Sequence, residues 1–299
     1  MVSMDRIAVY AVIALVLAAP PAAADEAAVA RGKYLFDAAG CAGCHTDSKN
    51  KGPLGAGGRA LKTPFGVFFS PNITPHAEHG IGTWSEDDLA RALRHGVSPG
   101  GDHYFPVFPY TSYSGISDAD IGDLGAYIFS LPAVARRNRP HQAPPPFGWR
   151  FLVPVWKWLN FTPGPLAPEP KRDAAWNRGA YLVEALAHCG QCHTPRGALG
   201  ARKPAMKLAG TPSGPEGGII PNITPDQETG IGGWSDADLR SLFKMGMKPD
   251  FDFVGGAMGE VVANTTSRLT DADLAAVIVY LRSLSPVRHQ VRRKKEGER

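Results

Sequence analysis

Two short stretches decide the fold: Cys41-Ala42-Gly43-Cys44-His45 and Cys189-Gly190-Gln191-Cys192-His193. Together they hold all four cysteines of the 299-residue chain. Cys-x-x-Cys-His is the attachment signature of c-type haem, because its two thiols can bond to one porphyrin edge and the next histidine can ligate the iron. The sequence therefore predicts two covalent haem c groups, with the following ligands: Cys41, Cys44 and His45 for the first and Cys189, Cys192 and His193 for the second.

Paired cysteines have two other common uses. A thioredoxin-like redox site uses Cys-x-x-Cys, and a zinc site can use two such pairs. Neither explains a histidine directly after both second cysteines, and neither pair follows a βαβ pattern. Haem attachment remains the better interpretation.

The similarity of the two halves extends well beyond the cysteines. Arg31-Gly32-x-Tyr34-Leu35 corresponds to Arg178-Gly179-x-Tyr181-Leu182, ahead of each motif. Further matches follow in the same order: Pro71-Asn72-Ile73-Thr74-Pro75 with Pro221-Asn222-Ile223-Thr224-Pro225, Gly80-Ile81-Gly82-x-Trp84-Ser85 with Gly230-Ile231-Gly232-x-Trp234-Ser235, and Ser117-Asp118-Ala119-Asp120 with Thr270-Asp271-Ala272-Asp273. This pattern indicates one domain that has been duplicated.

Each copy is predicted to be a small all-α unit with long loops rich in glycine and proline. A first helix leads into the cysteine motif, and a last helix starts at a capping Ser117 or Thr270 and covers residues 118–131 or 271–284. A further short helix is expected at 86–95 and at 236–245. We therefore expect residues 25–135 and 174–287 to form two tandem haem domains, joined by a linker at 136–173.

The two ends of the chain carry separate signals. Residues 1–24 read as an export signal, with Arg6, a short apolar run and a small-residue cleavage site, which predicts a periplasmic location. The formal charge of +4 equals the charge of residues 288–299, where six Lys and Arg face two Glu. The basic tail is thus a local feature and does not indicate nucleic-acid binding; it could attract an acidic partner or anionic lipid in a peripheral membrane association, or it could simply be a solubilising end.

The two halves differ in the residue that is available as sixth iron ligand. In the register of the repeat, Met258 lies opposite Phe108, and methionine is a usual sixth ligand of soluble c-type haem. Met258 is the predicted ligand of the second haem. Met245 and Met247 are its rivals, and both are expected to be packing residues at a helix end.

The first haem has no methionine between His45 and the linker. His103 is the predicted candidate ligand, and an empty sixth position capped by Phe108 is the alternative. Other histidines of this half are less favoured: His76, His79 and His95.

Three further side chains are candidate partners of the haem propionates: Trp84, Trp234 and Arg59. Each tryptophan could instead only fill the core beside the haem. The Asn-Ile-Thr triplets match a glycosylation acceptor, but we interpret them as turns held against the haem.

The linker contains three of the six tryptophans, between 149 and 158, which is more than a flexible spacer needs. It is expected to be a strap packed across both domains. The alternative is an aromatic docking surface for a partner or a membrane interface.

These residues resemble a known family, the multi-haem cytochrome c subunits of periplasmic dehydrogenases of the alcohol and gluconate dehydrogenase type and of some molybdenum hydroxylases. The runs that carry the resemblance include Thr63-Pro64-Phe65-Gly66, Phe108-Pro109-Tyr110, His193-Thr194-Pro195-Arg196 and Met258-Gly259-Glu260-Val261-Val262. The resemblance implies two tandem cytochrome c domains that pass electrons from a dehydrogenase catalytic subunit toward quinone or a terminal oxidase. Many family members have three haems and a ligating methionine in the first domain, and this chain departs from both features.

The sequence is compatible with three functions. The favoured one is an electron carrier or electron-transfer subunit without substrate chemistry of its own. The alternative is an enzyme whose open first haem acts on peroxide or a small sulfur compound, prompted by Phe108 in place of methionine. A haem sensor or storage module is the weakest, because the duplication does not favour it.

Overall fold

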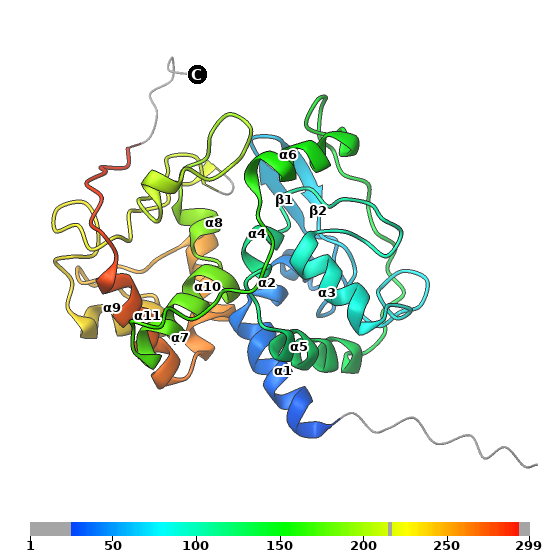
Figure 1. Cartoon of the computed structure of the whole chain (residues 1–299), viewed down its shortest axis with the longest axis horizontal. Helices are drawn as coiled ribbons and strands as arrows, with labels where there is room; N and C mark the ends of the chain where they lie inside the picture. Colours follow the sequence, from blue (N-terminus) through cyan, green and yellow to red (C-terminus); the bar gives the residue numbers. More distant parts are fainter. Residues whose placement is uncertain (1–24, 215–216, 293–299) are drawn as a thin grey trace, which may run out of the picture.

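The computed structural model describes residues 25–214 and 217–292. The predicted export signal and the last seven residues of the basic tail lie outside the described residues. The chain forms two halves that lie side by side, with the N-terminal half in blue to green and the C-terminal half in light green to red (Figure 1).

The first half is built mainly from helices separated by long loops. Its elements are α1 (Glu26–Ala38), α2 (Cys41–His45), the 3-10 turn η1 (Ser48–Asn50), β1 (Ala60–Thr63), β2 (Gly66–Phe69), α3 (Glu86–His95), α4 (Tyr110–Tyr113) and α5 (Asp118–Ser130).

The linker contains η2 (Arg150–Leu152) and α6 (Val153–Asn160). The second half follows the helix order of the first, without the strands: α7 (Ala174–Ala180), the π-helical turn η3 (Tyr181–Leu186), α8 (Gly190–His193), η4 (Pro204–Met206), α9 (Asp236–Met245), α10 (Gly256–Asn264), η6 (Thr266–Arg268) and α11 (Asp271–Ser283).

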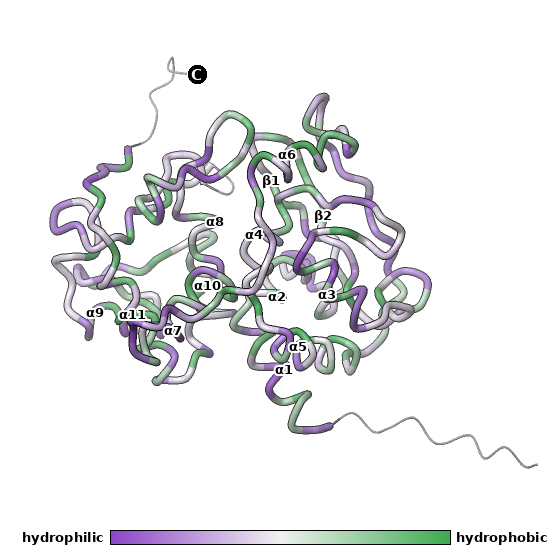
Figure 2. Tube along the Cα trace, viewed as in Figure 1, coloured by the Kyte–Doolittle hydropathy of each residue, from purple (hydrophilic) through white to green (hydrophobic). Residues whose placement is uncertain are grey.

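The repeated Arg-Gly-x-Tyr-Leu run marks the crossing of the first and last helices in each half. A Cβ added at Gly32 would lie 1.9 Å from the Asp123 carbonyl oxygen, and one at Gly179 would lie 2.0 Å from the Ala276 carbonyl oxygen. Only glycine permits so close an approach of α1 to α5 and of α7 to α11. Along these helices hydrophobic and hydrophilic residues interchange, as expected for helices with one buried face (Figure 2).

The short helices α3 and α9 begin where the sequence predicts them. Ser85 and Asp88 form a capping box at the start of α3, and Ser235 and Asp238 form the same box at α9. Each box satisfies backbone N–H groups that the first helical turn leaves without partners. Local sequence alone therefore sets both helix starts.

One feature corrects the expected all-α fold. Strands β1 and β2 form an antiparallel hairpin, with Ala60 opposite Phe69 and Thr63 opposite Gly66. The Thr63 hydroxyl donates to the Gly66 carbonyl at 2.9 Å and accepts from the Phe65 N–H at 3.1 Å, while Gly66 has a φ of 131°. This side-chain turn chemistry closes the hairpin. The described part of the chain is otherwise predominantly helical.

The two halves share one core. Leu35, Phe36 and Leu124 from the first half join Leu182 and Leu274 from the second in a single cluster of buried side chains. The linker contacts both halves, since Val153 packs with Phe68 and Phe105, and the Trp156 indole donates to the Leu199 carbonyl at 2.7 Å.

Candidate functional site

The two motif histidines are held in the same way. The Nδ1–H of His45 donates to the Pro71 carbonyl at 2.8 Å, and that of His193 donates to the Pro221 carbonyl at 2.9 Å. A carbonyl can only accept, so each proton lies on Nδ1 and the lone pair of Nε2 is available to a metal. Burial lowers the pKa of both imidazoles, which favours the neutral form that an iron ligand needs.

The Asn-Ile-Thr turns fix those proline carbonyls. The Asn72 side-chain oxygen accepts from the Thr74 N–H at 2.9 Å and the Thr74 hydroxyl at 2.7 Å, while its amide donates to the Val134 and Arg136 carbonyls. Asn222 repeats the pattern in the second half. Both amides are buried and fully hydrogen-bonded. Both triplets are hydrogen-bonded structural turns, and the expectation that they lie against the haem stays a prediction.

The thiols lie in an environment that suppresses thiolate chemistry. Burial raises the pKa of Cys41 and of Cys189 to about 12. A thioredoxin-like site requires the opposite shift, toward a reactive thiolate. Within residues 25–214 and 217–292 no group of three or more His, Cys, Asp or Glu side chains is placed to hold a metal ion. Half-buried thiols beside a correctly protonated histidine fit covalent haem attachment.

The two motifs face each other across the interface between the halves. The pKa of Cys192 is raised by burial and then by the nearby Cys44 thiol of the other motif. Helix α10 of the second half contacts α2, the first motif helix. In the opposite direction, the Gln191 amide of the second motif donates to the hydroxyls of Thr111 and Ser112, both at 2.9 Å.

An arginine holds the third residue of each motif. Arg59 donates to the Gly43 carbonyl at 2.5 Å and pairs with Glu260 of α10 at 2.5 Å. Arg196 donates to the Gln191 carbonyl at 3.1 Å. Arg59 was predicted only as a propionate partner, and Arg196 was not predicted at all. The sequence contains a signal for Arg196 in its position three residues after the motif histidine.

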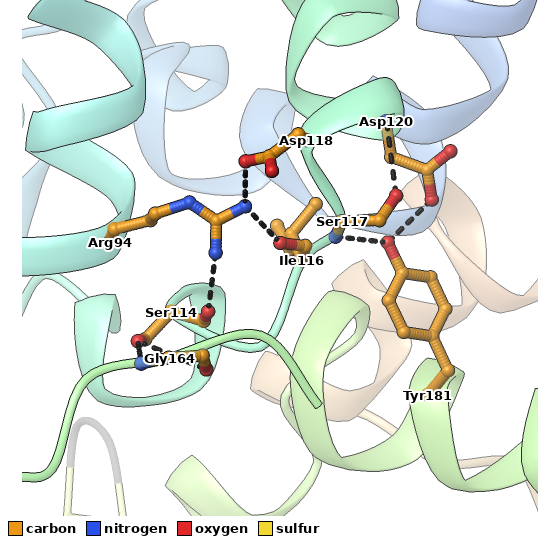
Figure 3. Close-up of polar contacts among 8 residues, drawn as sticks. All are labelled: Arg94, Ser114, Ile116, Ser117, Asp118, Asp120, Gly164 and Tyr181. Carbon is orange, nitrogen blue, oxygen red and sulfur yellow. Dashed lines mark hydrogen bonds and ion pairs between the residues drawn. The ribbon is translucent and has the colours of Figure 1, made fainter. Parts of the chain in front are cut away.

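Two tyrosines join the halves reciprocally. The Tyr34 hydroxyl donates to Asp273 at 2.5 Å and accepts from the Thr270 N–H at 3.3 Å, at the start of α11. The Tyr181 hydroxyl donates to Asp120 at 2.5 Å and accepts from the Ser117 N–H at 3.2 Å, at the start of α5 (Figure 3). Each tyrosine therefore caps the last helix of the other half.

The segment that receives Tyr181 is itself braced. Arg94 of α3 donates to the Ser114 and Ile116 carbonyls at 3.2 and 2.9 Å and pairs with Asp118 at 2.5 Å (Figure 3). The linker contributes the Gly164 N–H, which donates to the Ser114 hydroxyl at 2.7 Å. These contacts fix the start of α5 against the second half.

The candidate sixth ligands differ in their surroundings. Met258 is half-buried on α10, two residues before Glu260, which pairs with Arg59. Met245 is 60% exposed, so the expectation that it packs at the helix end is wrong. Phe108 is half-buried, and its ring lies 5.6–6.3 Å from the rings of three tyrosines: Tyr104, Tyr110 and Tyr113.

His103 is engaged by the linker. The Lys157 ammonium contacts the carbonyls of His95 and Gly96 at 2.6 and 2.8 Å and the His103 Nδ1 at 3.0 Å. Burial lowers the pKa of Lys157 to about 8, so at neutral pH its three N–H groups match these three acceptors. The His103 Nδ1 lone pair is then in use and its proton lies on Nε2. This contact counts against His103 as an iron ligand.

Trp84 and Trp234 occupy equivalent places in the two halves. Both are half-buried and pack against the shared core. This position is compatible with either a propionate contact or a packing role.

Among the described residues no helix is long and apolar enough to cross a membrane.

Comparison with known proteins identifies relatives along most of the chain. The cytochrome c family model matches residues 29–132 and 177–285. A "Diheme cytochrome c-type" protein of Cereibacter sphaeroides is 45% identical over 266 residues, which cover 86% of each chain. The fructose dehydrogenase cytochrome subunit of Gluconobacter japonicus is 40% identical over 266 residues, and the gluconate 2-dehydrogenase cytochrome c subunit of Pantoea cypripedii is 38% identical over 270 residues. The alignments cover 88% and 87% of this chain but only 54% and 60% of these two subunits.

Proposed function

Because the chain belongs to the cytochrome c family, we propose that it is a periplasmic two-haem electron-transfer protein that accepts electrons from a dehydrogenase catalytic subunit. The observation that carries the proposal is the pair of equivalent histidine–proline contacts in two motifs whose Cys44 and Cys192 thiols are near each other. Haems attached to both motifs would suit electron relay within one chain.

Each motif would hold one haem c group. Cys41 and Cys44 would attach the first group and Cys189 and Cys192 the second, with His45 and His193 as proximal ligands. Bound haem supplies a one-electron iron couple. The Pro71 and Pro221 carbonyls orient the ligands, and burial favours the neutral form of both imidazoles.

We further propose that the two positions differ in potential. Met258 would provide a thioether to the second haem, which raises its reduction potential. The aromatic group around Phe108 would leave the first position without a sulfur ligand. This difference would make the first haem the entry and the second haem the exit for electrons.

The proposed partners follow from the relatives' names, and the proposed location follows from residues 1–24. Named relatives are cytochrome subunits of fructose, gluconate and alcohol dehydrogenases, which supports a dehydrogenase as the electron donor. A quinone-linked acceptor or a terminal oxidase would take the electrons onward. The export signal predicted at 1–24 supports a periplasmic location.

A haem count and a redox titration of the purified holoprotein test the proposal. We expect two haems per chain by pyridine haemochrome analysis, one in the Cys41→Ala/Cys44→Ala variant, and two resolved one-electron steps. Deletion of the gene in the native host should abolish the oxidation of one substrate, an alcohol, a sugar or a sugar acid, when no artificial dye is added as electron acceptor. Turnover of peroxide by the holoprotein alone, with a persistent high-spin first haem, would replace this proposal with the open-haem enzyme.

A further inference from the structure

The linker helix α6 (Val153–Asn160) has its charge inside and its apolar residues outside. Lys157, its one charged residue, is 8% exposed, whereas Trp158 is 82% exposed. Val155 and Leu159 are also exposed, and their spacing places all three apolar side chains on one helix face. A helix on a water-facing surface normally has the opposite arrangement.

This orientation is fixed by contacts on the inner side. Val153 is buried against Phe68 and Phe105, and Lys157 is held by two carbonyls and one imidazole of the first half. Turning the outer residues inward would break all of these contacts. The exposed apolar face is therefore a built feature of the fold.

Two aromatic residues of the preceding turn extend this face. The rings of Trp149 and Phe151 stack at 5.7 Å, and Phe151 is 70% exposed. We call the combined surface the strap face, consisting of Trp149, Phe151, Val155, Trp158 and Leu159. Helix α6 lies at the outer edge of the first half, beside β1 and β2 (Figure 1).

The linker that carries the strap face is basic in its sequence. Residues 136–168 contain five Lys and Arg and no Asp or Glu. Arg150 lies over the ring of Phe105, in the cluster beneath α6, and donates to the His103 carbonyl at 2.6 Å. Among the described residues it is in no ion pair, so no carboxylate neutralises its charge beside the apolar face.

We propose that the strap face binds the surface of an anionic lipid bilayer. Exposed Trp, Phe and Leu beside Arg150, in a linker segment without acidic residues, match the chemistry of a helix that lies in the membrane interface. The apolar side chains would enter the boundary between headgroups and acyl chains, and Arg150 would meet lipid phosphates. Electron transfer and lipid binding are measured separately, so either proposal can fail alone.

Vesicle flotation of the full-length mature holoprotein tests this inference. Vesicles of phosphatidylcholine with and without phosphatidylglycerol are mixed with wild type and with a Phe151→Ser/Trp158→Ser variant. We expect wild type to float with the phosphatidylglycerol vesicles, with a blue-shifted tryptophan emission. The variant should lose about tenfold in partition, because two large apolar side chains no longer enter the interface.

Phe251→Ser/Phe253→Ser is the matched control, because both residues are exposed aromatics of the second half. It should bind vesicles like wild type, and unchanged haem absorption should show that both variants fold. The proposal is overturned if wild type does not float, if the strap variant floats equally well, or if both vesicle types bind equally. A concentration-dependent dimer that the strap variant abolishes, without vesicle binding, would instead assign the face to a second copy of the chain.

Discussion

Removal of the Tyr181 hydroxyl should loosen the contact between the halves. Tyr181→Phe deletes a hydrogen bond to the Asp120 carboxylate at 2.5 Å and leaves the Ser117 N–H without its acceptor at 3.2 Å. A hydrogen bond to a charged group contributes about 1.5–3 kcal/mol, and hydration of the freed groups reduces the loss to about 2 kcal/mol. For a chain of this size that loss corresponds to a decrease of about 4–8 °C in unfolding midpoint.

The equivalent Tyr34→Phe substitution should cost less. Asp273 loses the Tyr34 hydroxyl but keeps Arg178, which donates to both carboxylate oxygens at 2.8 and 2.7 Å. We expect a loss of about 1 kcal/mol, or about half the effect of Tyr181→Phe. The repeat alone would predict equal effects, so this difference tests the structure.

Thermal unfolding of the holoprotein, followed by far-ultraviolet circular dichroism, measures both losses. Tyr127→Phe is the control, because Tyr127 packs on the ring of Phe36 and its hydroxyl has no hydrogen bond within the described residues. It should change the midpoint by no more than about 1–2 °C. Equal effects of Tyr34→Phe and Tyr181→Phe, or an effect of Tyr181→Phe no larger than that of the control, would refute the reciprocal capping described above.

Three other predictions concern residues around the two Cys-x-x-Cys-His motifs. Asn72→Ala should destabilise the holoprotein by about 3 kcal/mol in chemical denaturation, because buried carbonyls and N–H groups lose their partners, and a loss under about 1 kcal/mol would contradict that role. Met258→Ala should abolish the red-edge absorption band of a sulfur-ligated ferric haem, while exposed Met245→Ala should retain it; persistence of the band in Met258→Ala would exclude Met258 as ligand. Burial lowers the pKa of His188 to about 4, so the unfolded chain binds more protons than the folded chain between pH 6.5 and 4. The stability of the fold should therefore decrease as the pH is lowered through that window. His188→Asn, which tolerates the positive φ of 43°, should flatten this dependence, and an unchanged slope in the variant would assign it to other groups.

The sequence by itself determined the features that depend on neighbouring residues. Cys-x-x-Cys-His fixes the attachment chemistry, and Ser85 and Ser235 fix the starts of α3 and α9 through bonds that span three residues. The repeat could be found because its spacing is preserved along the chain. The hairpin was missed because Thr63-Pro64-Phe65-Gly66 was used only to recognise a family, although its turn chemistry is also local.

The tertiary structure alone decided the contacts between distant residues. Tyr34 and Asp273 were both noted in the repeat, yet 239 positions separate them, and only the packing of the halves shows that they meet. The same applies to Arg59 with Glu260, and to Lys157, whose burial could not be read from an apolar linker helix. Such pairs depend on how whole helices cross, and helical periodicity specifies which face is buried without specifying what covers it.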